Sequence, residues 1–217
     1  MSHSLQILTI SAASIGFFHT LIGPDHYLPF IMIGKARNWS LSKIVWLTIL
    51  CGIGHILSSI VLGFIGIALE VQVQKLEWIE SFRGNLAAWA LIAFGLLYAL
   101  WGLRHWFFKK HPHSHAHHHA TDRKNITPWV LFVIFVLGPC EPLIPLLMYP
   151  AANESVYSLL MVTGVFGVTT IVTMTTIVIL SSYGLSFLSL NKFEKWSHSI
   201  AGLLIFLSGL AIQVLGL

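Results

Sequence analysis

The chain has 217 residues, of which 56% are hydrophobic and only 9% are charged, and its mean hydropathy is +0.80. This composition excludes a water-soluble domain and predicts a multispanning membrane protein. The formal net charge of +4 does not indicate nucleic-acid binding, because the basic residues lie in short segments between apolar runs.

Six apolar runs are each near or above the roughly 20 residues that a membrane-spanning helix requires. In chain order they cover Leu5–Ile33, Leu41–Leu69, Asn85–Phe107, Thr127–Tyr149, Tyr157–Ser181 and Ser197–Leu217. We therefore predict an all-α polytopic membrane protein with six transmembrane helices.

The basic residues predict the orientation of these helices. Only Lys75 and Arg83 of the twelve Lys and Arg residues fall outside the first, third and fifth connections. The other ten are Lys35, Arg37, Lys43, Arg104, Lys109, Lys110, Arg123, Lys124, Lys192 and Lys195. Because cytoplasmic loops carry an excess of Lys and Arg, we predict that these connections are cytoplasmic and that both termini lie outside a bacterial inner or plasma membrane.

The first span contains the segment His19-Thr-Leu-Ile-Gly-Pro-Asp-His26. Gly23-Pro24 should interrupt the helix, since proline removes a backbone hydrogen bond and clashes with the preceding turn. Burying the charged Asp25 carboxylate at bilayer depth is energetically unfavourable, so its presence indicates a functional site. We predict a metal cation as its partner.

Two connections contain polar segments. Residues 70–84 predict a short external amphipathic helix without a catalytic role. The third connection contains the tract His111-Pro-His-Ser-His-Ala-His-His-His119, a composition typical of metal binding. We interpret this tract as a cytoplasmic metal-capture loop.

The fourth span repeats the first in outline, because Gly138-Pro-Cys-Glu-Pro resembles Gly23-Pro-Asp-His-Tyr at an offset of 115 residues. Glycines of the later spans repeat at offsets of 112 and 114, in the pairs Gly52 and Gly164, Gly95 and Gly209, and Gly102 and Gly216. A duplicated three-span unit inserts in opposite orientations, which predicts two inverted repeats with broken first and fourth helices. The predicted divisions are residues 1–107, a His-rich loop at 108–126, and residues 127–217.

The alignment of the two breaks predicts a midmembrane metal site. It pairs Asp25 with Cys140 and His26 with Glu141. We predict Asp25 and His26 as the primary ligands, and the further candidates are His19, His55, Cys140 and Glu141. Imidazole, carboxylate and thiol ligands suit Ni²⁺, Co²⁺ or Zn²⁺ better than Ca²⁺ or Mg²⁺. Taken singly, His55 and Cys140 are also explained as packing residues.

The His-x5-Asp-His segment, the midmembrane His55 and the His-rich loop resemble the nickel/cobalt transporter superfamily, including NicO-type and UreH-like membrane proteins. In that superfamily a His-x4-Asp-His signature is associated with metal selectivity, and here one more residue separates His19 from Asp25. The resemblance implies a transporter of nickel or cobalt.

The Gly-Pro-Cys140 segment also resembles the CcdA and DsbD type of cytochrome c biogenesis protein, in which paired membrane cysteines at pseudosymmetric breaks carry reducing equivalents. That chemistry requires two cysteines that can meet, whereas Asp25 takes the position symmetric to Cys140 and Cys51 lies on another span. The resemblance implies a shared inverted-repeat fold, as does a likeness to LysE-type transporters.

From these observations we predict a non-enzymatic transporter that moves a divalent transition metal by alternating access. The position of the His-rich loop favours efflux, and exchange of protons for metal offers proton antiport as the coupling. The predicted partners are the lipid bilayer and the metal ion, without nucleic acid and with a homo-oligomer as a further option. A thiol-redox conduit and a metal-binding accessory protein are the alternatives.

The predicted orientation is tested by labelling single cysteines placed near each terminus with a membrane-impermeant maleimide. Labelling from the external face is expected, because the basic connections should be retained in the cytoplasm. Labelling of both termini from the cytoplasmic face alone would contradict the orientation.

Overall fold

The structure is a computed structural model that describes residues 3–108, 126–153, 155–187 and 196–215. Helices are the only regular secondary structure among the described residues, and the His-rich tract from His111 to His119 lies outside these residues. In chain order the elements are α1 (His3–Ile22), the 3₁₀ helix η1 (Pro24–His26), α2 (Leu28–Ala36), α3 (Leu41–Ala68), α4 (Val73–Phe108), α5 (Ile126–Leu137), α6 (Leu143–Asn153), α7 (Val156–Phe187) and α8 (Ser197–Leu215).

The predicted all-α membrane architecture is confirmed in its main feature. Five helices of the described chain, α1, α3, α4, α7 and α8, are long and apolar enough to cross a bilayer. Large hydrophobic side chains point away from the protein, with exposed fractions of 67% at Ile10 and 69% at Trp46. An apolar exterior of this extent suits lipid and not water.

Helical structure is interrupted at both predicted Gly-Pro positions. Between α1 and α2 the chain forms the short helix η1, with Pro24 as its first residue. Between α5 and α6 residues 138–142 are not helical, and α5 and α6 have only 12 and 11 residues. The prolines explain why the chain stops and restarts here, since proline disrupts a helix interior but fits a helix start.

The predicted connection at residues 70–84 is largely absent. α4 begins at Val73 and continues for 36 residues, so the external helix and the third span are one element. Gln, Lys and Glu are good helix formers, and this segment contains no proline to end the helix.

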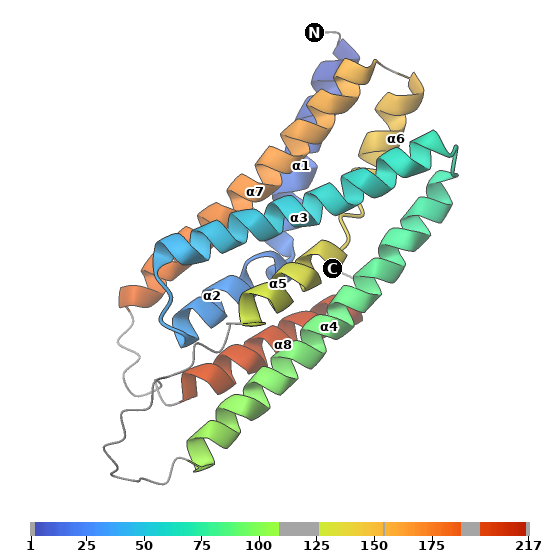
Figure 1. The fold of residues 1–217 in the computed structure, drawn as a ribbon. Helices are drawn as coiled ribbons and strands as arrows, with labels where there is room; N and C mark the ends of the chain where they lie inside the picture. The colour runs from blue at the N-terminus through green and yellow to red at the C-terminus, as the bar shows by residue number, and fades with distance from the viewer. Residues whose placement is uncertain (1–2, 109–125, 154, 188–195, 216–217) are drawn as a thin grey trace.

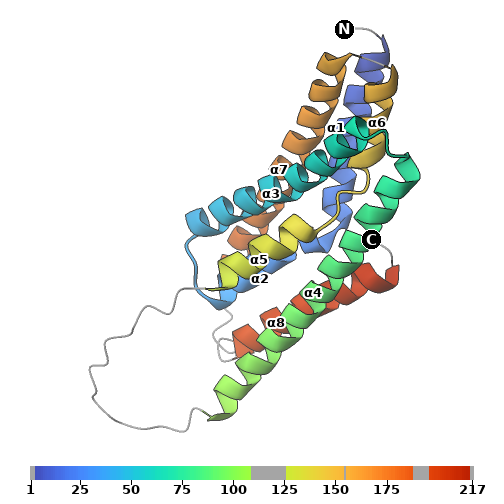
Figure 2. The same ribbon diagram turned by 45° about the vertical axis from the view of Figure 1, so that its right-hand side comes forward.

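The helices pack as a bundle in which α4 lies along α8, and α7 lies beside both α1 and α3 (Figures 1 and 2). The contact between α4 and α8 depends on glycine. A Cβ atom on Gly202 would collide with the backbone of Ala99, and one on Gly95 would collide with the backbone of Phe206. Small residues of this kind allow helices to approach closely in membranes, where packing replaces the hydrophobic effect.

Two large apolar clusters and a smaller third one form the interior of the described residues. One large cluster includes Phe30, Cys51 and Met174, and the other includes Cys140, Leu143 and Phe166. The two cysteines of the chain therefore pack in different parts of the bundle.

Gly202→Val should destabilise the protein, because the new side chain must push α8 away from α4. Overpacking of this kind typically costs about 1–3 kcal/mol, which SDS-induced unfolding in mixed micelles would measure.

Gly164→Val is the matched control, since a Cβ atom at Gly164 on α7 meets no neighbouring atom within 4 Å. Equal destabilisation by the two substitutions would show that the contact between α4 and α8 is not the cause.

Candidate functional site

A cavity of about 690 Å³ opens beside the two helix breaks. Its walls include His19, Asp25, His26, His55 and Glu141, five of the six predicted site residues. The sixth, Cys140, lies between the lining residues Pro139 and Glu141 and is fully buried. The fold therefore brings both breaks to one location.

Three histidines from different elements form a continuous row at this cavity. His19 is at the end of α1, His26 ends η1, and His55 is in the middle of α3. The ring centroids of His19 and His26 are 4.8 Å apart, those of His26 and His55 are 5.2 Å apart, and both pairs pack edge to face.

His26 is held by the break in which it lies. Its Nδ1 atom is 3.1 Å from both the Gly23 carbonyl oxygen and the Asp25 carboxylate oxygen, and the N–H group donates to these acceptors. A Cβ atom on Gly23 would lie only 2.6 Å from Nδ1 of His26, so only glycine leaves room for the ring.

The end of α5 and the second break contact the His55 ring through a backbone carbonyl oxygen and a glycine, as the first break contacts His26. The Nδ1–H group of His55 donates to the carbonyl oxygen of Phe135 on α5 over 3.3 Å. A Cβ atom on Gly138 would lie 3.2 Å from the same nitrogen, so glycine also allows the linker to approach this ring.

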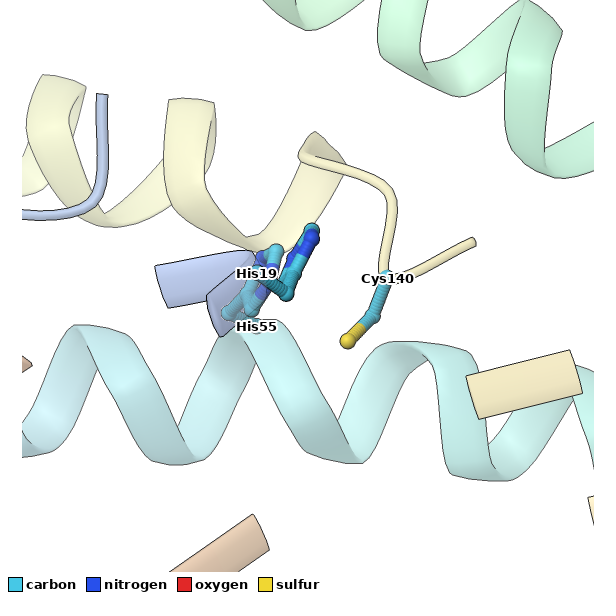
Figure 3. A group of neighbouring side chains, drawn as sticks. All are labelled: His19, His55 and Cys140. Carbon is cyan, nitrogen blue, oxygen red and sulfur yellow. The ribbon is translucent and has the colours of Figure 1, made fainter. Parts of the chain in front are cut away.

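Cys140 completes a compact group with two of the histidines. His19, His55 and Cys140 each offer one atom, nitrogen or sulfur, such that the three atoms lie within 4.8 Å of one another. Figure 3 shows the Cys140 side chain extending from the linker after α5 toward the two imidazoles above α3. With a small side-chain movement, imidazoles and a thiol placed in this way can exchange a proton or bind a soft metal ion.

The two predicted carboxylates take other positions. The Asp25 side chain, about one third exposed, contacts His26, and Glu141 is exposed at the cavity wall. Neither belongs to the three-residue group. Direct metal coordination by Asp25, His26 or Glu141 stays a prediction.

Sequence reasoning missed two residues of the site, Glu80 and Arg83. Both lie in the segment that was predicted to be an external helix, yet the Glu80 side chain is completely buried. Arg83 binds Glu80 with 2.6 Å between Nη1 and Oε1. The spacing of three residues was the available signal, but oppositely charged pairs at this spacing also form on exposed helix surfaces.

This ion pair binds the backbone of the second break. Arg83 Nη2 donates to the carbonyl oxygen of Val136 over 2.8 Å and to that of Gly138 over 3.4 Å. The backbone N–H of Cys140 donates to Glu80 Oε2 over 3.1 Å. Broken helices are tolerated at membrane depth only where protein or water satisfies the free backbone groups, and here α4 does so.

Comparison with known protein families gives a match over most of the chain. A family model described as the cytochrome c biogenesis protein transmembrane region matches residues 29–211. No curated protein and no solved structure matches the chain.

This match corrects two predictions. The proposed membership of the nickel/cobalt transporter superfamily is wrong, and the predicted transport of nickel or cobalt falls with it. That resemblance relied on a short His-Asp-His motif with altered spacing, whereas the observed match extends over most of the chain and includes α2 to α7 and most of α8.

Arg83→Ala should destabilise the protein strongly, because it removes the positive charge paired with the buried Glu80 carboxylate and the donor to two carbonyl oxygens. Breaking a buried ion pair in this way costs about 3–5 kcal/mol, and SDS-induced unfolding would measure the loss.

Glu77→Gln is the control for this prediction, since Glu77 lies about one turn before Glu80 on α4 and is exposed. It should change the free energy of unfolding by no more than about 0.5 kcal/mol. An Arg83→Ala variant as stable as Glu77→Gln would contradict the role given to the ion pair.

Proposed function

Because the chain belongs to the family of cytochrome c biogenesis protein transmembrane regions, we propose that it relays reducing equivalents within the membrane by thiol–disulfide exchange. The observation that carries this proposal is the position of Cys140, in the non-helical linker between α5 and α6 and next to the cavity. From the sequence alone, a thiol-redox conduit was one of the alternatives to metal transport.

The surroundings of Cys140 support a reactive role. A ring nitrogen of His55 and one of His19 lie within 4.8 Å of the sulfur, close enough for a small side-chain movement to let an imidazole accept the thiol proton. The thiolate is the form that attacks a disulfide. The neighbouring residues Pro139 and Glu141 line the cavity, which offers a route for a partner to approach.

Cys51 is the second thiol that the reaction requires. It is fully buried on α3, one helical turn before His55. The two thiols are free, and a disulfide requires Cα atoms within about 7 Å. Because Gly138 lies against His55, and Cys51 packs in the other apolar cluster, we propose that the linker at residues 138–142 moves along α3 during the reaction.

The proposed exchange proceeds in two balanced steps. The Cys140 thiolate attacks the disulfide of a partner, forming a mixed disulfide and releasing one partner thiolate. The Cys51 thiolate then attacks Cys140 Sγ, which forms the bond between Cys51 and Cys140 and releases the second partner thiolate. The partner gains two electrons, and a dithiol donor restores the two cysteines.

We also propose the inverted-repeat arrangement for this relay. In each half a broken first helix is followed by two long helices: α1 and α2 precede α3 and α4, and α5 and α6 precede α7 and α8. In this arrangement α1 corresponds to α5 and α3 corresponds to α7. The contact of α1 with α7 should therefore have a counterpart in a contact of α5 with α3, and both contacts occur. With α5 and α6 counted as one broken span, the arrangement has six spans, and rocking of one half against the other could move the linker.

The relay is tested by oxidising the reduced, purified protein with oxidised glutathione and analysing it by mass spectrometry. Wild type should form the internal Cys51–Cys140 disulfide and retain no glutathione. Cys51→Ser should retain one glutathione on Cys140, since the resolving thiol is gone.

Cys140→Ser is the matched variant and should retain no glutathione, because Cys51 is buried away from the cavity. A wild-type chain that carries glutathione without forming the internal disulfide would contradict the proposed relay.

A further inference from the structure

We propose that His19, His55 and Cys140 form a binding site for one thiophilic transition metal ion, with Zn²⁺ as the representative ion. The site rests on the geometry of these three side chains and does not depend on the proposed thiol relay.

The distances suit such an ion. The three candidate ligand atoms lie within 4.8 Å of one another. Zinc binds imidazole nitrogen at about 2.0–2.1 Å and thiolate sulfur at about 2.3 Å, so tetrahedral ligands are separated by roughly 3–4 Å. A contraction of about 1 Å, achieved by side-chain rotation, would close the site around the ion.

Unpaired nitrogen atoms are the second observation. The Nε2 atoms of His19, His26 and His55 are buried and have no hydrogen-bond partner within the described part of the chain. A buried nitrogen without a partner is unfavourable. Histidines that only filled space would be expected to pair these atoms, whereas a metal ion would use them.

The hydrogen bond of His55 selects the required form of its ring. Its Nδ1–H group donates to the carbonyl oxygen of Phe135, which leaves the lone pair on Nε2. A backbone carbonyl that holds one ring nitrogen while the other binds the ion is typical of metal sites in proteins. His55 therefore has the tautomer and the fixed orientation of a ligand.

His26 and Asp25 extend the site without belonging to the three-residue group. Asp25 accepts from Nδ1 of His26, and the His26 ring lies against His19 and near His55. The three protein ligands leave a fourth position for water or another ligand, as in zinc sites that are not purely structural.

The ligand chemistry also limits the kind of ion. One thiolate and two imidazoles favour Zn²⁺ or Cu⁺, because Ca²⁺ and Mg²⁺ prefer oxygen ligands. The cavity reaches His19 and His55, and the carboxylates of Asp25 and Glu141 on its wall would attract a cation.

The test uses the full-length, reduced and metal-free protein in detergent, with Cd²⁺ as an ultraviolet-active probe and Zn²⁺ as its competitor. Binding should produce thiolate-to-cadmium charge-transfer absorption that saturates at one ion per chain, and Zn²⁺ should remove it. The histidine tract at residues 111–119 cannot contribute to this thiolate absorption, because it contains no cysteine.

Cys51→Ser is the matched control. It changes the other buried cysteine, which lies on the same helix as His55, and it should leave the absorption unchanged. Cys140→Ser should abolish the absorption. His19→Gln and His55→Gln, on separate helices, should each weaken apparent affinity by about ten-fold or more.

Absence of the absorption from wild type, or its persistence in Cys140→Ser, would overturn the site. Unchanged affinity in both histidine variants would do the same. Failure of the relay is distinguishable, because Cys51→Ser should prevent formation of the internal disulfide while leaving metal binding intact.

Discussion

The interaction on which the site depends is the contact between the buried pair Glu80–Arg83 and the non-helical linker between α5 and α6. Backbone groups that leave a helix inside a membrane cannot be satisfied by lipid. Arg83 donates to two carbonyl oxygens at the end of α5, and Glu80 accepts from the backbone N–H of Cys140. The side chains of α4 thus stabilise a non-helical segment that would otherwise be unfavourable. Without them, Cys140 would have no defined position opposite the histidines.

The first break is stabilised differently, by contacts within its own segment. The Nδ1–H group of His26 donates to the carbonyl oxygen of Gly23 and to the Asp25 carboxylate, so this ring nitrogen finds its partners within the turn. Each break therefore holds one imidazole against a glycine, His26 at Gly23 and His55 at Gly138. The two solutions use different partners but produce the same result, which is a polar centre between apolar clusters.

A thiol relay and a metal site would use the same sulfur atom, and this gives them a chemical connection. The Cys140 sulfur can bind an ion as a thiolate or join Cys51 in a disulfide, but it cannot do both at once. Oxidation would therefore release the ion, and a bound ion would protect the thiol from exchange. Because the histidine row lies beside Cys140, metal binding and disulfide formation would compete for the same sulfur atom.

The sequence by itself determined the membrane class, the long helices and the two Gly-Pro breaks, because apolar length and proline act locally on the chain. It also placed His19, His55 and Cys140 among six candidate ligands, since polar side chains are rare within apolar runs. Only the tertiary structure decided which of the candidates meet. Glu80 and Arg83 had the pattern of an exposed helix, and their burial follows from partners on α3 and the second break, 25 to 60 residues away. Contacts over such distances come from the packing of α4 against the bundle, which no local pattern specifies.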